Sequence, residues 1–72
     1  MRNARDLAIR SRLEATKTYG LVEDYQIDWQ DSPLSAPHIV VRGRRALPAQ
    51  ITRNYLTVLL GGFVPTRAIT VT

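Results

Sequence analysis

The chain has no cysteine, a single histidine and no long hydrophobic run. Without cysteine it has neither a disulfide bond nor a thiolate that could attack a substrate or hold zinc. A membrane-spanning helix needs about 20 mostly apolar residues, and charges recur up to Lys17, so neither a span nor a signal peptide is predicted. The 72 residues have room for one small domain, residues 1–72, which we expect to be cytoplasmic.

Acidic residues are absent from the second half of the chain. Residues 1–31 carry five bases and six acids, a net charge of −1, whereas residues 32–72 carry five arginines and no acid, a net charge of +5. A purely basic half is typical of a surface that faces anions. Nine of the ten bases are arginine, which binds phosphates and carboxylates in a bidentate manner, although a genome rich in G and C also raises the arginine content.

Residues 4–18 contain neither glycine nor proline and predict a helix, with Asn3 as its N-cap and Gly20 as its C-cap. Charged residues follow one another at intervals of four, and we expect this charged row to face solvent: Arg2, Asp6, Arg10 and Glu14. The opposite side is mostly small: Ala4, Leu7, Ala8, Ser11 and Ala15. Ile9 and Leu13 form a separate apolar pair. The helix must pack closely, because an isolated helix of this length is marginal in water.

Apolar and polar residues alternate from residue 21 to residue 30, which is typical of a half-buried strand. Glu23 interrupts the alternation near its start. Tyr25 and Trp29 fall on the same face as Ile27. They could stack on bases, but a domain this small needs large apolar side chains in its core, which is the interpretation we adopt.

A loop with two prolines follows at residues 31–37, and residues 38–42 predict a second strand. Ile39 and Val41 would share the core face, and the two strands are expected to pair antiparallel through a long hairpin loop.

A second helix is predicted over residues 48–60, with Pro48 as its first residue and Gly61-Gly62 as its end. Its core face is expected to comprise Ile51, Tyr55, Val58 and Leu59, with Leu56 at the margin. Its polar face comprises Gln50, Arg53, Asn54 and Thr57. Residues 67–72 are β-branched and alternate, which predicts a short third strand.

These elements predict a small α+β domain in the order helix, strand, strand, helix, strand. Two helices would pack on one face of a mainly antiparallel sheet. The first four elements, over residues 4–60, loosely resemble the layout of double-stranded-RNA-binding domains and of small toxin ribonucleases with that shape. The chain lacks their third strand before the second helix, and it lacks the glycine–serine–histidine element of the toxins.

The residues that catalysis would need are scarce, so we expect no enzymatic activity, no metal and no cofactor. His38 stands at a strand start with no second histidine, and the loop beside it has no glycine-built oxyanion hole. We interpret it as an ordinary edge-strand histidine. A small ribonuclease-like toxin is the remaining enzymatic alternative.

The sharpest functional feature is the run Arg42-Gly43-Arg44-Arg45, at a strand end leading into a helix. Three guanidinium groups there could bind phosphates or an acidic partner. Alternatively, Arg42 and Arg44 could pair across the hairpin with Asp24 and Asp28.

Further candidate contacts are Arg53 on the second helix and Arg5 and Arg12 on the first, although a solvated helix face explains the latter two as well. The sequence thus predicts a basic module that binds nucleic acid or acts as a regulator. The alternative is a protein-interaction module of the inhibitor, adaptor or assembly-factor type that phages and mobile elements encode. It would bind an acidic or nucleoprotein partner, for instance through an exposed edge strand at residues 66–72, or form a homodimer.

Overall fold

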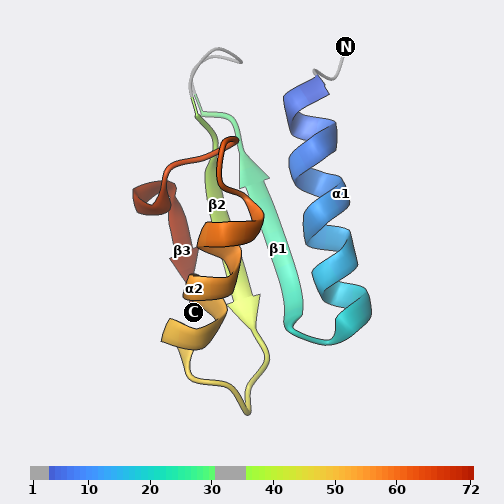
Figure 1. Ribbon diagram of the computed structural model, residues 1–72, viewed down its shortest axis with the longest axis vertical. Helices are drawn as coiled ribbons and strands as arrows, with labels where there is room; N and C mark the ends of the chain where they lie inside the picture. The colour runs from blue at the N-terminus through green and yellow to red at the C-terminus, as the bar shows by residue number, and fades with distance from the viewer. Residues whose placement is uncertain (1–3, 31–35) are drawn as a thin grey trace.

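The computed structural model describes residues 4–30 and 36–72. Its elements are α1 (Ala4–Tyr19), β1 (Val22–Asp28), β2 (His38–Gly43), α2 (Ala49–Leu59), the 3-10 helix η1 (Thr66–Ala68) and β3 (Ile69–Val71). The predicted α+β class and the order of helices and strands are confirmed (Figure 1). The proposed cap Asn3 and most of the proline-containing loop lie outside the described residues.

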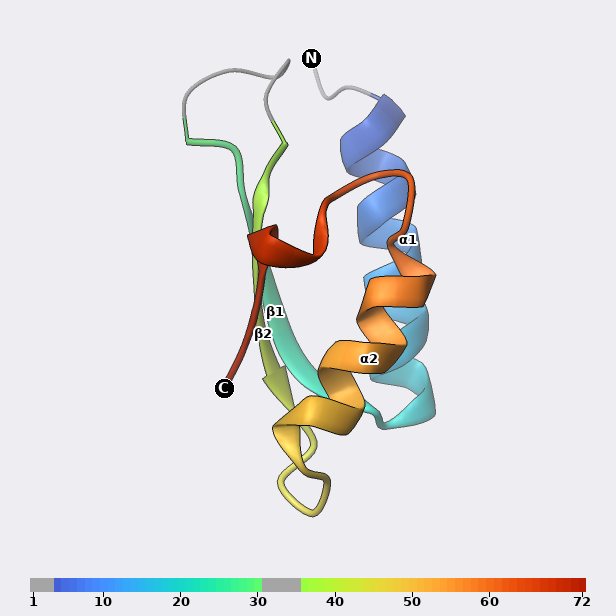
Figure 2. The same cartoon turned by 60° about the vertical axis from the view of Figure 1, so that its left-hand side comes forward.

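The three strands form one sheet in the order β1-β2-β3. β1 and β2 pair antiparallel, as expected, whereas β2 and β3 pair parallel, so the sheet is mixed. A parallel pair needs a long crossover connection, and α2 provides it. Figure 2 shows both helices on the same side of the sheet, and in the described part of the chain no helix covers the other face.

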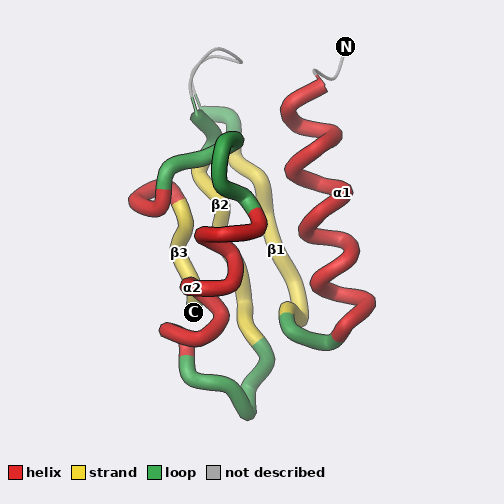
Figure 3. Tube along the Cα trace, viewed as in Figure 1, coloured by secondary structure: helices red, strands yellow, loops and turns green. Residues whose placement is uncertain are grey.

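Gly20 ends α1, as predicted, whereas α2 ends at Leu59 with Leu60 as its C-cap, and Gly62 lies in the turn that follows. Gly20 has a φ of 83°, a left-handed conformation that suits glycine best, and Gly62 has a φ of 89°. At the end of α1 the Gly20 N–H donates to the Lys17 carbonyl and the Leu21 N–H donates to the Thr16 carbonyl. This pair of bonds is a Schellman motif, and it turns the chain sharply from α1 into β1 (Figure 3).

The core lies between the sheet and the helices and consists of Ile9, Leu13, Val22, Ile39, Val41, Leu56, Leu60, Val64 and Ile69. Tyr25, Ile27 and Trp29 pack against it while partly buried, which confirms that the aromatic face of β1 belongs to the core. The register shifts between Val22 and Asp24. This irregularity is the interruption that Glu23 introduces into the alternation, and it allows Val22 as well as Tyr25 to face inward.

The expected orientation of α1 is wrong in one respect. Its charged row was expected to face solvent, but Asp6 is only 5% exposed and Glu14 contacts Tyr25 on β1. The small-residue side faces outward instead, and Leu7 is 53% exposed. Ile9 and Leu13 direct the helix onto the sheet, because burying their side chains is favourable. This burial also removes neighbouring polar side chains from water, and that cost is small when the polar groups find hydrogen-bond partners.

The expected core face of α2 is wrong for three of its four residues, and only Leu59 packs against the core as expected. Thr52 and Leu56 are buried, whereas Ile51, Tyr55 and Val58 are exposed. Two faces of this helix carry apolar residues, so its periodicity fits two orientations. The crossover from β2 to β3 selects the orientation that buries Thr52 and Leu56. The helix starts one residue later than predicted: Pro48 is the N-cap and has an extended ψ of 140°.

Candidate partner-binding surface

Arg42, Arg44 and Arg45 lie together where β2 ends and the connection to α2 begins; we call them the arginine corner. Arg42 stands opposite Asp24 in the β-ladder, but its Nε lies 3.6 Å from Oε1 of Glu23. Arg42 therefore faces Asp24 in the ladder, as the alternative predicted, but its ion pair is with Glu23. His38, not Arg44, is the partner of Asp28 in the ladder.

The side chains of Arg44 and Arg45 are exposed, and within residues 4–30 and 36–72 they make no hydrogen bond or ion pair. Their backbone N–H groups do have partners: that of Arg44 donates to the Leu21 carbonyl and that of Arg45 to a Glu23 carboxylate oxygen. The loop backbone is thus anchored while two guanidinium groups stay in solvent. Even with Glu23 and Asp24 close by, the corner keeps a net positive charge.

Arg5 and Arg12, two other predicted contact residues, bind within the chain. Arg5 donates two hydrogen bonds to the Phe63 carbonyl, at 3.1 Å from Nε and 2.7 Å from a terminal nitrogen. Arg12 lies 4.5 Å from the centroid of the Phe63 ring, a cation–π distance. Both arginines hold the segment after α2 against α1, and the structure does not bring them together with the arginine corner.

Arg53 has a third kind of role. Its side chain donates to the Ile69 carbonyl at 3.2 Å, which joins α2 to β3. The Ile69 N–H is also occupied, by the Thr66 carbonyl. Thr72 uses its backbone N–H and carbonyl on the side of β2. The outer edge of β3 therefore offers an incoming strand little beyond the backbone of Val71, so the edge at residues 66–72 is largely protected.

An apolar strip on α2 is the feature that the sequence interpretation missed. Ile51, Tyr55 and Val58 follow one another at helical spacing and are 51%, 42% and 83% exposed; we call them the α2 stripe. Exposed large apolar side chains that line up on one face often mark a contact surface. The same spacing is present in the sequence, but there it predicts a buried face equally well.

The α2 stripe and the arginine corner meet at a hollow of ≈ 270 Å³ lined by Tyr19, Gly20, Leu21, Arg44, Leu47 and Tyr55. Arg44 and Leu47 also line a second hollow with the other two arginines and Glu23. An apolar floor with a guanidinium group at its border can receive an apolar side chain that has a carboxylate beside it.

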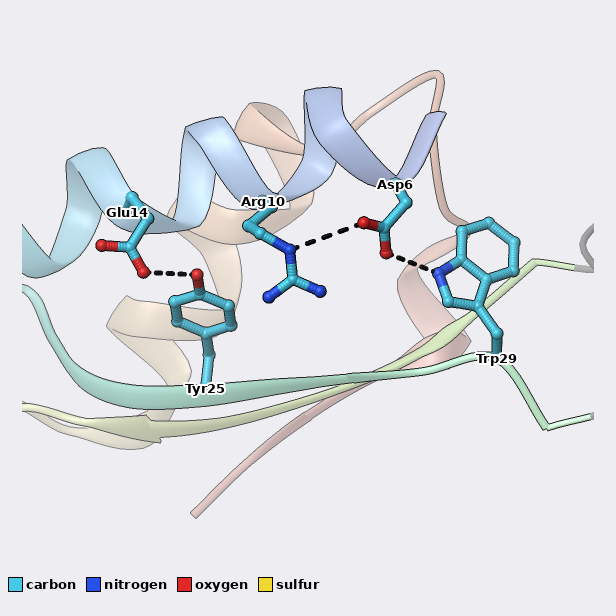
Figure 4. Close-up of polar contacts among 5 residues, drawn as sticks. All are labelled: Asp6, Arg10, Glu14, Tyr25 and Trp29. Carbon is cyan, nitrogen blue, oxygen red and sulfur yellow. Dashed lines mark hydrogen bonds and ion pairs between the residues drawn. The ribbon is translucent and has the colours of Figure 1, made fainter. Parts of the chain in front are cut away.

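A separate polar network joins α1 to β1 (Figure 4). Asp6 accepts hydrogen bonds from the Trp29 indole at 2.8 Å and from Arg10 at 3.5 Å. Further along, the Tyr25 hydroxyl donates to the Glu14 carboxylate. Burial and then Glu14 raise the pKa of Tyr25 above its ordinary value, and Arg10 opposes them. The network gives the polar side of α1 its partners, which is why this side can lie against a strand.

His38 does not lie on an edge strand, as the sequence suggested, because β2 is the central strand of the sheet. Its Nε2 is 2.8 Å from the Thr70 hydroxyl on β3, so one ring nitrogen is engaged in joining two strands. Among the described residues no three acidic, histidine or cysteine side chains form a group that could hold a metal ion.

No family model matches the chain, and no match was found among curated proteins or solved structures. Within residues 4–30 and 36–72, neither helix has the length and hydrophobicity that crossing a membrane requires.

Proposed function

We propose that this protein is a non-enzymatic interaction module that binds an acidic protein partner through the arginine corner. The observation that carries the proposal is the position of two solvent-exposed guanidinium groups, Arg44 and Arg45, beside an apolar surface of the same loop and helix. Guanidinium groups next to large apolar side chains are typical of the residues that contribute most to protein–protein binding.

The same geometry favours a protein over a nucleic acid as the partner. Of the six arginines that the sequence offered for binding, Arg5, Arg12 and Arg53 use their side chains within the chain. Nucleic-acid affinity comes mainly from many phosphate contacts, and it gains nothing from an apolar strip such as the α2 stripe. A protein partner makes use of both features.

The proposal can be tested with tagged protein as bait in extract of the source organism, with and without nuclease. The captured protein is then identified, purified and titrated against wild type and Arg44→Glu/Arg45→Glu. Arg67→Glu is the matched control, because Arg67 is exposed on η1, away from the β2–α2 loop. We expect capture to survive nuclease, the double variant to bind at least about tenfold more weakly, and the control to stay within about twofold.

Two results would overturn the proposal. One is a purified partner whose affinity is the same for wild type and Arg44→Glu/Arg45→Glu. The other is capture that nuclease abolishes, together with binding of the purified chain to a generic duplex or single strand. Such binding would weaken linearly in log–log terms as salt rises, with a slope near −0.9 per phosphate contact in a duplex, and would establish the nucleic-acid alternative.

A further inference from the structure

We infer that the partner docks as an amphipathic helix, with its apolar face on the α2 stripe and acidic residues at the end that meets Arg44 and Arg45. This inference rests on the proposed function and deepens it, because it names the kind of segment that is bound. The α2 stripe supplies the length: Val58 lies seven positions after Ile51, a span of about 10 Å, or two helical turns, at 1.5 Å per residue.

The backbone edges of the sheet argue against an added strand as the mode of binding. At β3, Arg53 and η1 occupy the groups of Ile69. At β1, the Asp24 carboxylate accepts the N–H of Tyr25 at 2.9 Å, so this strand also has an occupied donor in the middle of its length. With these edge groups occupied, we expect binding to rely on side chains, and a helix placed on a helix face is a common way to bury side chains at such spacing.

Charge argues against a second copy of this chain as the occupant. Residues 36–72, which contain the arginine corner and the α2 stripe, carry no acidic residue. Among the described acids, Asp6, Glu14 and Glu23 already have partners within the chain. Asp24 and Asp28 alternate with the core residues of β1 and so point to the face of the sheet away from the helices. A copy that packs its own α2 stripe against this one would thus bring no carboxylate to Arg44.

The size of the apolar surface also argues against a second copy of this chain. Three partly exposed side chains present roughly 300 Å². A stable interface buries about 800 Å² on each partner, so the α2 stripe alone does not hold a second copy. Extended over Tyr19, Leu47 and the arginine corner, the surface becomes larger, and an acidic segment can match it in charge.

The experiment is a selection of peptides from a phage-displayed library of helical sequences with random surface positions, followed by anisotropy titration of the best labelled peptide. Ile51→Gln/Val58→Gln tests the α2 stripe. Leu7→Gln is the matched control, because Leu7 is 53% exposed on α1 and Ile51 is 51% exposed on α2. We expect enriched peptides with apolar residues at i, i+3 or i+4 and i+7 and with acids at one end. The stripe variant should bind at least about tenfold more weakly, and the control should stay within about twofold.

Several outcomes would refute the inference. They are no enrichment, enriched peptides without acids or without helical spacing, and binding that the stripe variant leaves unchanged. A wild-type dimer in sedimentation that Ile51→Gln/Val58→Gln converts to monomer would assign the surface to a second copy. If the natural partner loses affinity for Arg44→Glu/Arg45→Glu but not for the stripe variant, the proposed function stands and the helical docking mode alone fails.

Discussion

The buried carboxylate of Asp6 accepts a hydrogen bond from the indole Nε1 of Trp29 at 2.8 Å, across 23 positions of sequence. It connects the first turn of α1 to the residue that follows β1. Because Asp6 is only 5% exposed, its charge has to be balanced by donors within the fold. The contact thus makes a charged residue part of the packing between helix and sheet.

Replacing the indole tests this contact. In Trp29→Phe the Asp6 carboxylate loses a donor while it stays buried, so the free energy of unfolding should fall by about 1–3 kcal/mol. A double-mutant cycle in urea with Asp6→Ala should give a coupling of at least about 0.5 kcal/mol, the usual range for contacting residues. Additive effects of the two substitutions would show that the indole and the carboxylate stabilise the fold separately.

The Tyr25 hydroxyl should make stability depend on pH in the alkaline range. Burial and Glu14 raise its pKa in the folded protein, so the folded state holds this proton more tightly than the unfolded chain does. The stabilisation is fully present below about pH 10, the unfolded value, and is lost as the pH rises above it. Urea unfolding from about pH 8 to about pH 11 should therefore show wild type losing its advantage over Tyr25→Phe. Parallel curves for the two proteins would contradict the assignment.

Thr52 offers a stabilising substitution. Its side chain is fully buried, and within the described residues its Oγ1 has no hydrogen-bond partner. Thr52→Val puts a methyl group in place of the hydroxyl, and we expect it to raise the free energy of unfolding by about 1 kcal/mol, seen as a melting temperature about 4–8 °C higher. An unchanged or lower melting temperature for Thr52→Val would mean that the hydroxyl is satisfied.

Gly43→Ala should lower the melting temperature, because a Cβ there would lie 3.1 Å from Oγ1 of Thr52.

Two substitutions on α2 distinguish its two apolar faces. Leu56 is fully buried, so Leu56→Ala should cost about 2–5 kcal/mol, as truncation of a core leucine does. Val58 is 83% exposed, and Val58→Ala should change stability by no more than about 0.5 kcal/mol. Chemical unfolding of both variants provides the comparison. Equal losses of unfolding free energy in the two variants would indicate that Val58 is buried, as periodicity predicts.

The elements of this fold follow closely from local sequence, whereas the faces of its helices do not. Gly20 ends α1 through a conformation that few other residues adopt, and alternation on β2 correctly places Ile39 and Val41 in the core. In α2, by contrast, apolar residues lie on two faces of the helix, and Thr52 lies in the core while Val58 does not. Periodicity identifies an apolar stripe but does not say which of two stripes the sheet will cover.

By itself, the sequence determined which helices and strands form and in what order, the α+β class and the concentration of arginine in the later half, because backbone preferences and composition act locally. Tertiary structure alone decided which arginines remain in solvent. Arg5 binds a carbonyl 58 positions away, and Arg53 binds the backbone of β3, while Arg44 and Arg45 reach no partner among the described residues. A guanidinium group on a long side chain binds whatever acceptor the folded chain brings within its reach, and spacing in sequence does not reveal that acceptor.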